Sequence, residues 1–348
     1  MTSNFNRIDA VAADAPELAG YGTHAVGVRT ETLAYRGLVI ELWYPAECDS
    51  ALTKTPRIYD TLLRDGVTPI RLKGRAIRDA VALAGDFPLV ILSHGYPGNR
   101  LLMAHLGETL ASRGYRVASL DHSLSTYADK GDFLQTLIHR PLDTRHAADH
   151  LDAQAYAIIG YSMGGYGALV SGGAAVSEAA VAEYGAALAQ HMPPDVDPRL
   201  RAIVPIGPWG RHRGIWDAAG LGGLRVPALI MAGSADEVSG YASGMRLIYD
   251  EAPGAMLLTF EGAGHNAAAP FPAPQEAFTP SAALDFLPAD HYADAVWDTV
   301  RMNGIAQHFA TAFLGLHLKQ IPEMAQYFKD FKGFPPDAAK GLRLEQKA

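Results

Sequence analysis

One stretch, AYAIIGYSMGGYGAL at 155–169, constrains the fold of this chain more than any other. Its first residues suit a buried strand, and the small residues at its end favour a helix. Between them lies GYSMG, the pattern G-x-S-x-G, whose glycines leave room for a strand that reverses abruptly into a helix. Such an elbow would hold Ser162 at a helix N-terminus, where free N–H groups favour developing negative charge. The stretch predicts a nucleophilic serine, and its simpler alternative is a Gly-rich turn with an incidental serine.

Short apolar runs alternate with helical patterns on both sides of this elbow. Strands are expected at 87–93, 115–120, 155–159, 202–206, 228–232 and 255–260. Helices are expected at 100–113, 141–151 (with Pro141 at its start), 176–191 and 296–318. This alternation predicts an α/β fold, a mostly parallel, doubly wound sheet with helices on both faces.

The N-terminal part reads differently from this alternating pattern. Strands at 21–29 and 38–44 are close enough to form a hairpin, which we expect at the antiparallel edge of the sheet. Turn residues interrupt 46–86, so this segment is interpreted as loops and short helices. No internal repeat is visible, and a single domain over 1–348 is expected.

In a doubly wound sheet, reactive side chains gather at the C-terminal ends of the strands. Asp236 follows the strand at 228–232, and His265 follows the strand at 255–260. The order Ser162, Asp236, His265 is the one expected when an acid and a base serve a serine elbow. His265 would take the serine proton and later return it, and Asp236 would hold the imidazole in the useful tautomer.

Other residues compete for these roles. Asp121 and Glu237 are alternative acids, and the alternative bases are His94, His122 and His212. His94 is a candidate substrate-binding residue and is interpreted as a loop-organising residue whose ring hydrogen-bonds backbone near the site. Asp121 and His122 either line the substrate pocket or satisfy loop amides, and the sequence leaves both readings open.

A tetrahedral intermediate also needs N–H donors aimed at its oxyanion. Met163, the residue after the nucleophile, supplies one backbone N–H in elbows of this kind. The loop after the strand at 87–93 supplies the other, and Tyr96 is the best candidate because Pro97 has no N–H. The side chains of Tyr96 and Met163 either form apolar walls around the acyl group of the substrate or are ordinary packing residues.

The chain resembles the α/β-hydrolase superfamily, and within it the dienelactone hydrolase and platelet-activating-factor acetylhydrolase-like group, with a more distant similarity to bacterial cutinases and polyester hydrolases. The resemblance spans about 21–266 and rests on VGVRT, ELWYPA, PLVILSHGYPGNR, LASRGYRVASLDH, GYSMGGYGA and the Asp236 and His265 turns. It implies a Ser-His-Asp carboxylic ester hydrolase without metal or organic cofactor. Dienelactone hydrolases of the best-known type have cysteine where this chain has Ser162, so ring-opening of dienelactone is not expected.

Two segments beyond the common core are expected to decide substrate choice. Residues 171–200 are interpreted as a possible cap, and the Pro-rich segment 266–296 as a lid whose phenylalanines, among them Phe271 and Phe278, pack on the pocket rim. Trp209, just past the strand at 202–206, is either a further part of the pocket wall or a core residue. A small cap or lid limits the room for substrate, so short acyl esters or lactones are expected.

Composition limits the partners. The formal charge of −8 argues against nucleic acid, and the first twenty residues lack an apolar core, so neither an export signal nor a membrane anchor is expected. Cys48 is the only cysteine, which excludes an intrachain disulfide and fits the reducing cytoplasm, and no metal site is predicted. The partner expected is a small-molecule ester, and the sequence leaves the oligomeric state open.

Three other classes of function are alternatives to ester hydrolysis. An amidase or peptidase would use the same triad, and the sequence does not separate the two. A non-catalytic binding protein is disfavoured because all three triad positions hold competent residues. A nucleotide-binding oxidoreductase is disfavoured because the Gly-rich run at 220–223 precedes a strand, whereas a dinucleotide-binding loop follows one.

Overall fold

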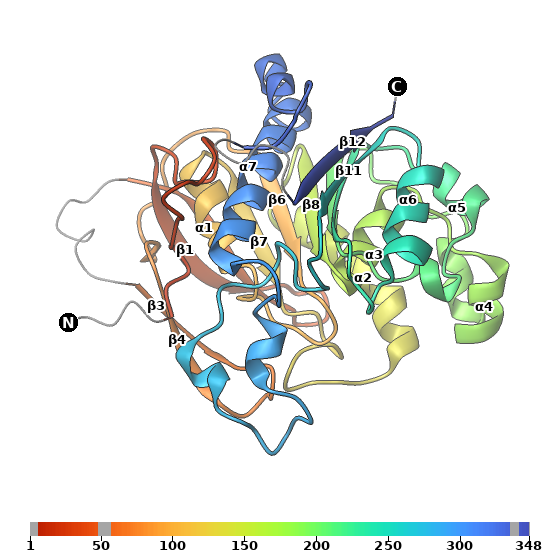
Figure 1. Cartoon of the computed structure of the whole chain (residues 1–348), viewed down its shortest axis with the longest axis horizontal. Helices are drawn as coiled ribbons and strands as arrows, with labels where there is room; N and C mark the ends of the chain where they lie inside the picture. The colour runs from red at the N-terminus through yellow and green to blue at the C-terminus, as the bar shows by residue number, and fades with distance from the viewer. Residues whose placement is uncertain (1–5, 48–56, 335–340, 348) are drawn as a thin grey trace.

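The computed structural model describes residues 6–47, 57–334 and 341–347, so Cys48 lies outside the described residues. Within these ranges one sheet of ten strands runs in the order β12-β11-β10-β9-β8-β6-β7-β2-β1-β5, and β3 and β4 form a separate hairpin (Figure 1). The six strands from β7 to β11 in this order are parallel to one another, whereas β2, β1 and β12 complete it through antiparallel pairings. The predicted mostly parallel sheet is confirmed.

The strands are β1 Ala25–Thr32, β2 Val39–Ala46, β3 Arg57–Leu62, β4 Pro69–Gly74, β5 Ile77–Arg78, β6 Leu89–Ser93, β7 Arg116–Leu120, β8 Tyr156–Tyr161, β9 Leu200–Ile206, β10 Ala228–Gly233, β11 Ala255–Phe260 and β12 Leu342–Gln346. The helices are α1 Ala104–Ser112, α2 Phe133–His150, α3 Met163–Ser171, α4 Glu178–Tyr184, α5 Ala218–Gly222, α6 Arg246–Glu251 and α7 Thr299–His317. The inner strands and the β1–β2 hairpin agree with the sequence prediction, and β5 rather than β1 closes that edge.

Helices cover both faces of the sheet, and each face has its own apolar core. Ile159 of β8 packs with α1 and α7, while its neighbour Ile158 packs on the opposite face with α2, α3 and α6. The helices on the two faces can be followed in Figure 1. Consecutive strand residues point to opposite faces, so a strand buried on both must be apolar throughout. This explains why the inner strands are continuous apolar runs.

The prediction of loops and short helices over 46–86 was wrong where the structure describes that segment. Strands β3 and β4 pair antiparallel there, and β5 adds to the edge of the large sheet. Ile70 and Leu72 of β4 are buried, whereas the residues between and before them are exposed. The strand therefore has a period of two, but it is too short and too polar to stand out between turn residues.

Helix α2 begins earlier than predicted, because Pro141 lies inside it and not at its start. The side chain of Asp132 caps the helix by accepting from Leu134 N at 2.8 Å. A proline inside a helix leaves the carbonyl four residues earlier without its N–H partner. That carbonyl, of Leu137, instead accepts from Tyr166 Oη at 3.0 Å, so a tertiary contact makes the proline tolerable.

Three further elements differ from the sequence prediction. Helix α1 starts at Ala104 and not at 100. The helix expected over 176–191 is divided at Gly185, whose φ of 132° ends α4 before a 3₁₀ turn. Strand β12, which pairs with β11, was not predicted at all. Helix α7 lies close to its expected bounds. No helix among the described residues has the length and apolar character needed to cross a bilayer.

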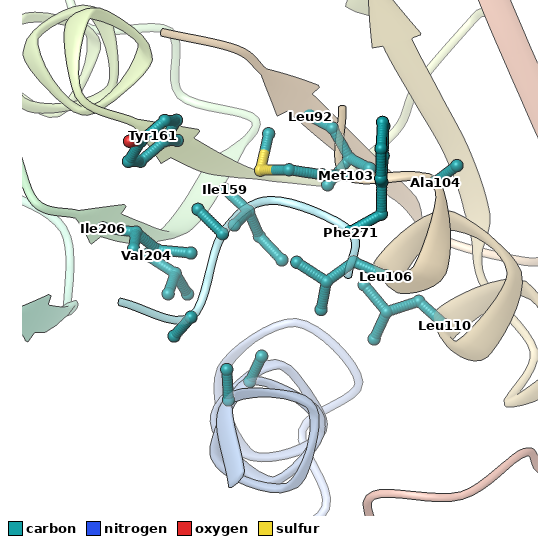
Figure 2. Packing of buried hydrophobic residues seen from close by; sticks show 14 of the residues in the cluster. Leu92, Met103, Ala104, Leu106, Leu110, Ile159, Tyr161, Val204, Ile206 and Phe271 are labelled. Carbon is teal, nitrogen blue, oxygen red and sulfur yellow. The ribbon is translucent and has the colours of Figure 1, made fainter. Parts of the chain in front are cut away.

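The Pro-rich segment 266–296 does not present Phe271 at a pocket rim, which corrects the lid hypothesis for this residue. Phe271 is 1% exposed, belongs to the core cluster that contains Met103 and Leu106 (Figure 2), and stacks on Tyr292 with ring centroids 5.0 Å apart. Phe278 is exposed at 60%. The first half of this segment is therefore held by burial of Phe271 in the core.

We expect Phe271→Ala to destabilise the fold by about 3 to 5 kcal/mol, since it removes a buried ring and leaves a cavity. Phe278→Ala, in the same segment but exposed, should change the free energy of unfolding by less than about 0.5 kcal/mol. Urea denaturation followed by circular dichroism measures both. Equal stability of the two variants would contradict the packing described here.

Candidate active site

Ser162 occupies a sharp turn between β8 and α3. Its backbone angles, φ of 53° and ψ of −109°, lie in a region that residues other than glycine rarely adopt. Its N–H donates to Ile206 O at 2.8 Å. A Cβ on Gly160 would lie 2.1 Å from Gly164 O, and one on Gly164 would lie 1.9 Å from Ser93 O. Only glycine fits either position, so the G-x-S-x-G spacing is a direct consequence of the tightness of this turn.

The predicted acid, base and nucleophile meet in one hydrogen-bonded row. His265 Nε2 lies 3.0 Å from Ser162 Oγ, and His265 Nδ1–H donates to Asp236 Oδ2 at 2.8 Å. The other oxygen of Asp236 accepts from the amides of Val238 at 2.8 Å and Ser239 at 2.9 Å. Because the carboxylate is held at both oxygens, the imidazole keeps the tautomer in which Nε2 can accept the serine proton.

These three side chains come from the C-terminal ends of three parallel strands. Ser162 follows β8, Asp236 lies three residues after β10, and His265 lies five residues after β11. The strand order β11-β10-β9-β8 brings these ends to one edge of the sheet. Ser162 is 8% exposed and Asp236 is 4% exposed, so the acid is shielded from water while the histidine and serine meet a cavity.

This cavity has a volume of about 370 Å³. Its walls come from the β6–α1 loop (95–97), the elbow (Tyr161 and Ser162), Val238, the loop after β11 (265–266) and the later part of the Pro-rich segment (Phe286 and 290–291), with Arg64 from the β3–β4 turn. None of the described lining residues belongs to 171–200. The expected cap segment therefore lies away from this cavity, whereas part of the expected lid borders it.

Both residues predicted to donate to the oxyanion lie next to Ser162 in the chain or in space. Met163 is the first residue of α3, and the N–H groups of a helix's first turn have no acceptor within the helix. Tyr96 lines the cavity, and the loop before it packs closely on the nucleophile: a Cβ on Gly95 would lie 3.3 Å from Ser162 Cβ. The structure thus brings both predicted donor residues to the serine.

A buried arginine holds the loop that carries Tyr96. Arg140, 1% exposed in the middle of α2, donates through Nη1 to His94 O and through Nη2 to Gly95 O at 3.0 Å and Ser125 Oγ at 2.7 Å. The ring of His94 adds a donation from Nδ1 to Gly95 O at 2.7 Å. Because a peptide unit is planar, fixing Gly95 O also fixes the direction of the Tyr96 N–H on its other side.

A second Ser-His-Asp row lies behind this loop. Ser93 Oγ is 2.8 Å from His122 Nε2, and His122 Nδ1–H donates to Asp143 Oδ2 at 2.8 Å, with all three residues at most 1% exposed. Burial and the charge of Arg140 hold the pKa of His122 well below its usual range, and burial raises the pKa of Asp143 to about 6. This row does not line the cavity, so substrate cannot reach its serine.

Several residues expected to bind substrate do not line the cavity. The ring of His94 hydrogen-bonds backbone as predicted, since Nδ1 donates to Gly95 O at 2.7 Å, and the ring of His122 belongs to the second row. Both residues are fully buried, and burial lowers the pKa of His94. Asp121 accepts from Arg100 N at 2.7 Å and pairs with its guanidinium, which makes it a structural residue.

The remaining two expected substrate contacts are corrected as well. Trp209 contacts the elbow through its backbone, its N–H donating to Ser162 O at 3.1 Å, and its ring packs edge-on against Phe133, 5.3 Å away. Phe271 lies in the core. Neither residue lines the Ser162 cavity.

Phe286, one of the phenylalanines of the expected lid, lines the cavity, whereas the sequence reasoning missed Arg64, Asn266 and His291 as cavity residues. Asn266 follows His265 directly in the sequence, and this position next to the predicted base could have indicated that it borders the site. Its side chain accepts from Tyr161 Oη at 3.1 Å and donates to Ala293 O at 3.0 Å, which ties the Pro-rich segment back to the elbow. Arg64 had no such signal, because only the packing of the β3–β4 hairpin brings it to the cavity. Across the described ranges, no group of three or more His, Cys, Asp or Glu side chains is arranged to hold a metal ion.

Comparisons with known proteins agree with this architecture. A family model described as alpha/beta hydrolase fold matches residues 88–171, and one described as platelet-activating factor acetylhydrolase, isoform II, matches residues 41–128. The solved structure of a ferulic acid esterase from Streptomyces cinnamoneus superposes with a TM-score of 0.64 at 18% identity, over 97% of this chain and 99% of that one. The chain has the α/β-hydrolase fold, and the predicted resemblance to this superfamily is confirmed.

Curated relatives give a similarity in sequence. Cutinase 2 from Thermobifida cellulosilytica is 27% identical over 187 residues, which are 51% of this chain and 60% of the cutinase. Cutinase cut1 from Thermobifida fusca is 27% identical over 187 residues, 51% of this chain and 49% of that cutinase. The similarity thus spans about half the length of these curated relatives, which are named cutinases.

Proposed function

We propose that this protein is a serine hydrolase that cleaves carboxylic esters through an acyl-enzyme on Ser162. The observation that carries the proposal is the row Ser162–His265–Asp236, which opens onto a cavity beside two backbone amides. The similarity to cutinases supports an ester as the bond cleaved. A cavity of about 370 Å³ suits a small ester better than a long acyl chain.

In the proposed first step, Ser162 Oγ attacks the ester carbonyl carbon while His265 Nε2 takes the hydroxyl proton. The carbonyl oxygen becomes an oxyanion that accepts from the N–H groups of Tyr96 and Met163. Each such donor is worth about 10²- to 10³-fold in rate, because it is already oriented before charge develops. The intermediate collapses as His265 gives its proton to the leaving alcohol.

In the second step, water takes the place of the alcohol. His265 removes a proton from that water, the resulting hydroxide adds to the acyl carbon, and Ser162 leaves with the proton that His265 returns. Asp236 stabilises the imidazolium formed in each half of the reaction. The chain's own residues therefore supply the base, the nucleophile and the oxyanion donors for both steps.

An amidase would use the same groups, so the choice of bond is tested directly. We expect p-nitrophenyl acetate to be cleaved and p-nitroacetanilide to be cleaved far more slowly, with absorbance at the nitrophenolate and nitroaniline bands as the measurement. A serine-directed phosphonate should block the ester reaction, and peptide mass mapping should place its adduct on Ser162. Faster anilide cleavage would favour the amidase alternative, and an adduct on another serine would refute the nucleophile.

The contacts of Arg140 support a positioning role in this reaction. We expect Arg140→Lys to lower kcat for p-nitrophenyl acetate by about 10- to 100-fold with KM nearly unchanged, since lysine keeps the charge but cannot donate to His94 O and Gly95 O together. Arg145→Lys, an exposed arginine of the same helix that pairs with Asp195, is the matched control. If Arg140→Lys stays folded by circular dichroism and keeps the wild-type kcat, the loop does not depend on this guanidinium.

A further inference from the structure

Arg64 brings a positive charge into the Ser162 cavity without a carboxylate to neutralise it. It lies in the turn that joins β3 and β4, and its side chain forms part of the cavity wall with Ser162 and His265. No Asp or Glu of the described residues lies within ion-pair distance of its guanidinium. The described arginines near it on the hairpin and β6–α1 loop, Arg71 and Arg100, are each paired with an aspartate.

The hydrogen bonds of Arg64 also leave its donors largely unused. Its only side-chain hydrogen bond among the described residues runs from Nη1 to Pro97 O at 3.4 Å, which is long for a charged donor. Its Nε is buried with no partner. A guanidinium has five N–H donors, and a buried donor without a partner costs free energy. The Nη1 and Nη2 groups make only that one bond to the described residues, so a ligand in the cavity can supply acceptors for their remaining N–H donors.

The groups around Arg64 are aromatic or neutral. Its guanidinium carbon lies 5.8 Å from the ring centroid of Tyr127, and its backbone N–H donates to Tyr292 Oη at 3.0 Å. Burial and the charge of Arg64 hold the pKa of His291 well below its usual range, so this neighbour is uncharged. The carboxylate of Asp65, the next residue in the sequence, accepts hydrogen bonds from the amides of Val67 and Thr68 and stabilises the turn.

One carboxylate does border the cavity, that of Asp290. It is exposed and forms no ion pair with Arg64, so the guanidinium remains available to a ligand. The chain as a whole carries a formal charge of −8, which repels anions at long range. A selective preference for an anionic substrate must therefore come from a local contact inside the cavity.

We propose that Arg64 forms an anion subsite of the active-site cavity and that the substrate is an ester carrying a free carboxylate, such as the half-ester of a dicarboxylic acid. This inference rests on the proposed ester hydrolysis and names its substrate class. A carboxylate matches the planar fork of the guanidinium and can accept two parallel N–H bonds. Half-esters are what partial hydrolysis of a diester produces, so the reaction that supplies this substrate is an earlier ester cleavage.

The test compares acids with their neutral methyl esters. On the acyl side the pair is mono-p-nitrophenyl adipate and methyl p-nitrophenyl adipate, and on the alcohol side it is 4-acetoxybenzoate and methyl 4-acetoxybenzoate. We expect the wild type to favour the acid in at least one pair by about tenfold in kcat/KM, the size of effect given by one charge-assisted hydrogen bond. Arg64→Gln should lower kcat/KM for the acid by about tenfold more than for the neutral ester, which removes the preference, and Arg64→Lys should restore part of it.

Arg71→Gln is the matched control, because this arginine lies on the same hairpin, is exposed, and should leave the preference unchanged. A merely structural role of Arg64 would lower turnover of acid and neutral esters alike, and that result would overturn the proposal. So would an unchanged preference in Arg64→Gln.

A binding measurement separates this proposal from the proposed function. Calorimetric titration of Ser162→Ala with monomethyl adipate and with dimethyl adipate needs no turnover. We expect the acid to bind about tenfold more tightly, and Arg64→Gln on the same background to abolish the difference. Equal binding of the two compounds would refute the anion subsite even if both esters were hydrolysed, whereas preferential binding without any hydrolysis would refute only the proposed reaction.

Discussion

Ser162→Ala should lose ester hydrolysis by at least about 10⁴-fold in kcat while remaining folded, because the acyl-enzyme cannot form without the hydroxyl. The small remaining rate would come from the oxyanion donors and from substrate binding. Alanine differs from serine only by the hydroxyl, so the strained backbone of the elbow is retained. Steady-state hydrolysis of p-nitrophenyl acetate, with circular dichroism as the check on folding, measures the effect.

A control for this prediction exists within the same fold. Ser93 also has a histidine and an aspartate in hydrogen-bonded order, but it is 1% exposed and lies behind the loop. We expect Ser93 to stay unlabelled by a phosphonate that labels Ser162. If Ser162→Ala kept more than about a tenth of the wild-type rate, the nucleophile would lie elsewhere.

Asp236→Asn should lower kcat by about 10³- to 10⁴-fold with little change in stability. The asparagine amide would donate to His265 Nδ1, which favours the tautomer with the proton on Nε2, and this nitrogen could then no longer accept from Ser162. The asparagine oxygen can still accept from the amides of Val238 and Ser239, so the turn should persist. Activity assays and thermal denaturation of the variant provide the measurement.

Asp121→Asn is the matched control, since Asp121 is one of the two residues that compete with Asp236 for the role of the acid in the sequence. Its carboxylate pairs with Arg100 at a partly exposed position, and such a pair contributes at most about 1 kcal/mol to stability. We expect kcat of this variant to stay within about threefold of the wild type. A larger loss of kcat in Asp121→Asn than in Asp236→Asn, with both folded, would show that the acid has been assigned to the wrong residue.

The elbow and the inner strands could be predicted because their constraints are local. The turn at Ser162 admits only glycine at 160 and 164, and atoms within a few residues impose that requirement, apart from the contact of Gly164 with Ser93. The strands β6, β8 and β10 are buried on both faces, so their sequences are almost entirely apolar, with Ser93 at the end of β6 as the polar exception. Parallel strands then bring Asp236 and His265 to the edge of the sheet that carries Ser162.

The errors have one cause, which is that burial depends on elements distant in sequence. Phe271 and Phe278 are seven residues apart in one Pro-rich segment and look equivalent, yet the first packs against α1 and the second faces solvent. Pro141 suggested a helix start, and only the contact from Tyr166 to Leu137 allows it inside α2. His94 and His122 resemble pocket residues in the sequence, but Arg140, Asp143 and Ser93 enclose them.

By itself the sequence determined the class of fold, the serine elbow and the chain order of the acid and base, since each follows from steric needs of neighbouring residues or from strand periodicity. Only the tertiary structure decided which charges meet the cavity. Arg64 reaches it from a hairpin 98 positions before Ser162 in the numbering, and Arg140 reaches the β6–α1 loop from the middle of a helix. The physical reason is that a guanidinium's partners are set by packing in three dimensions, which local sequence does not record.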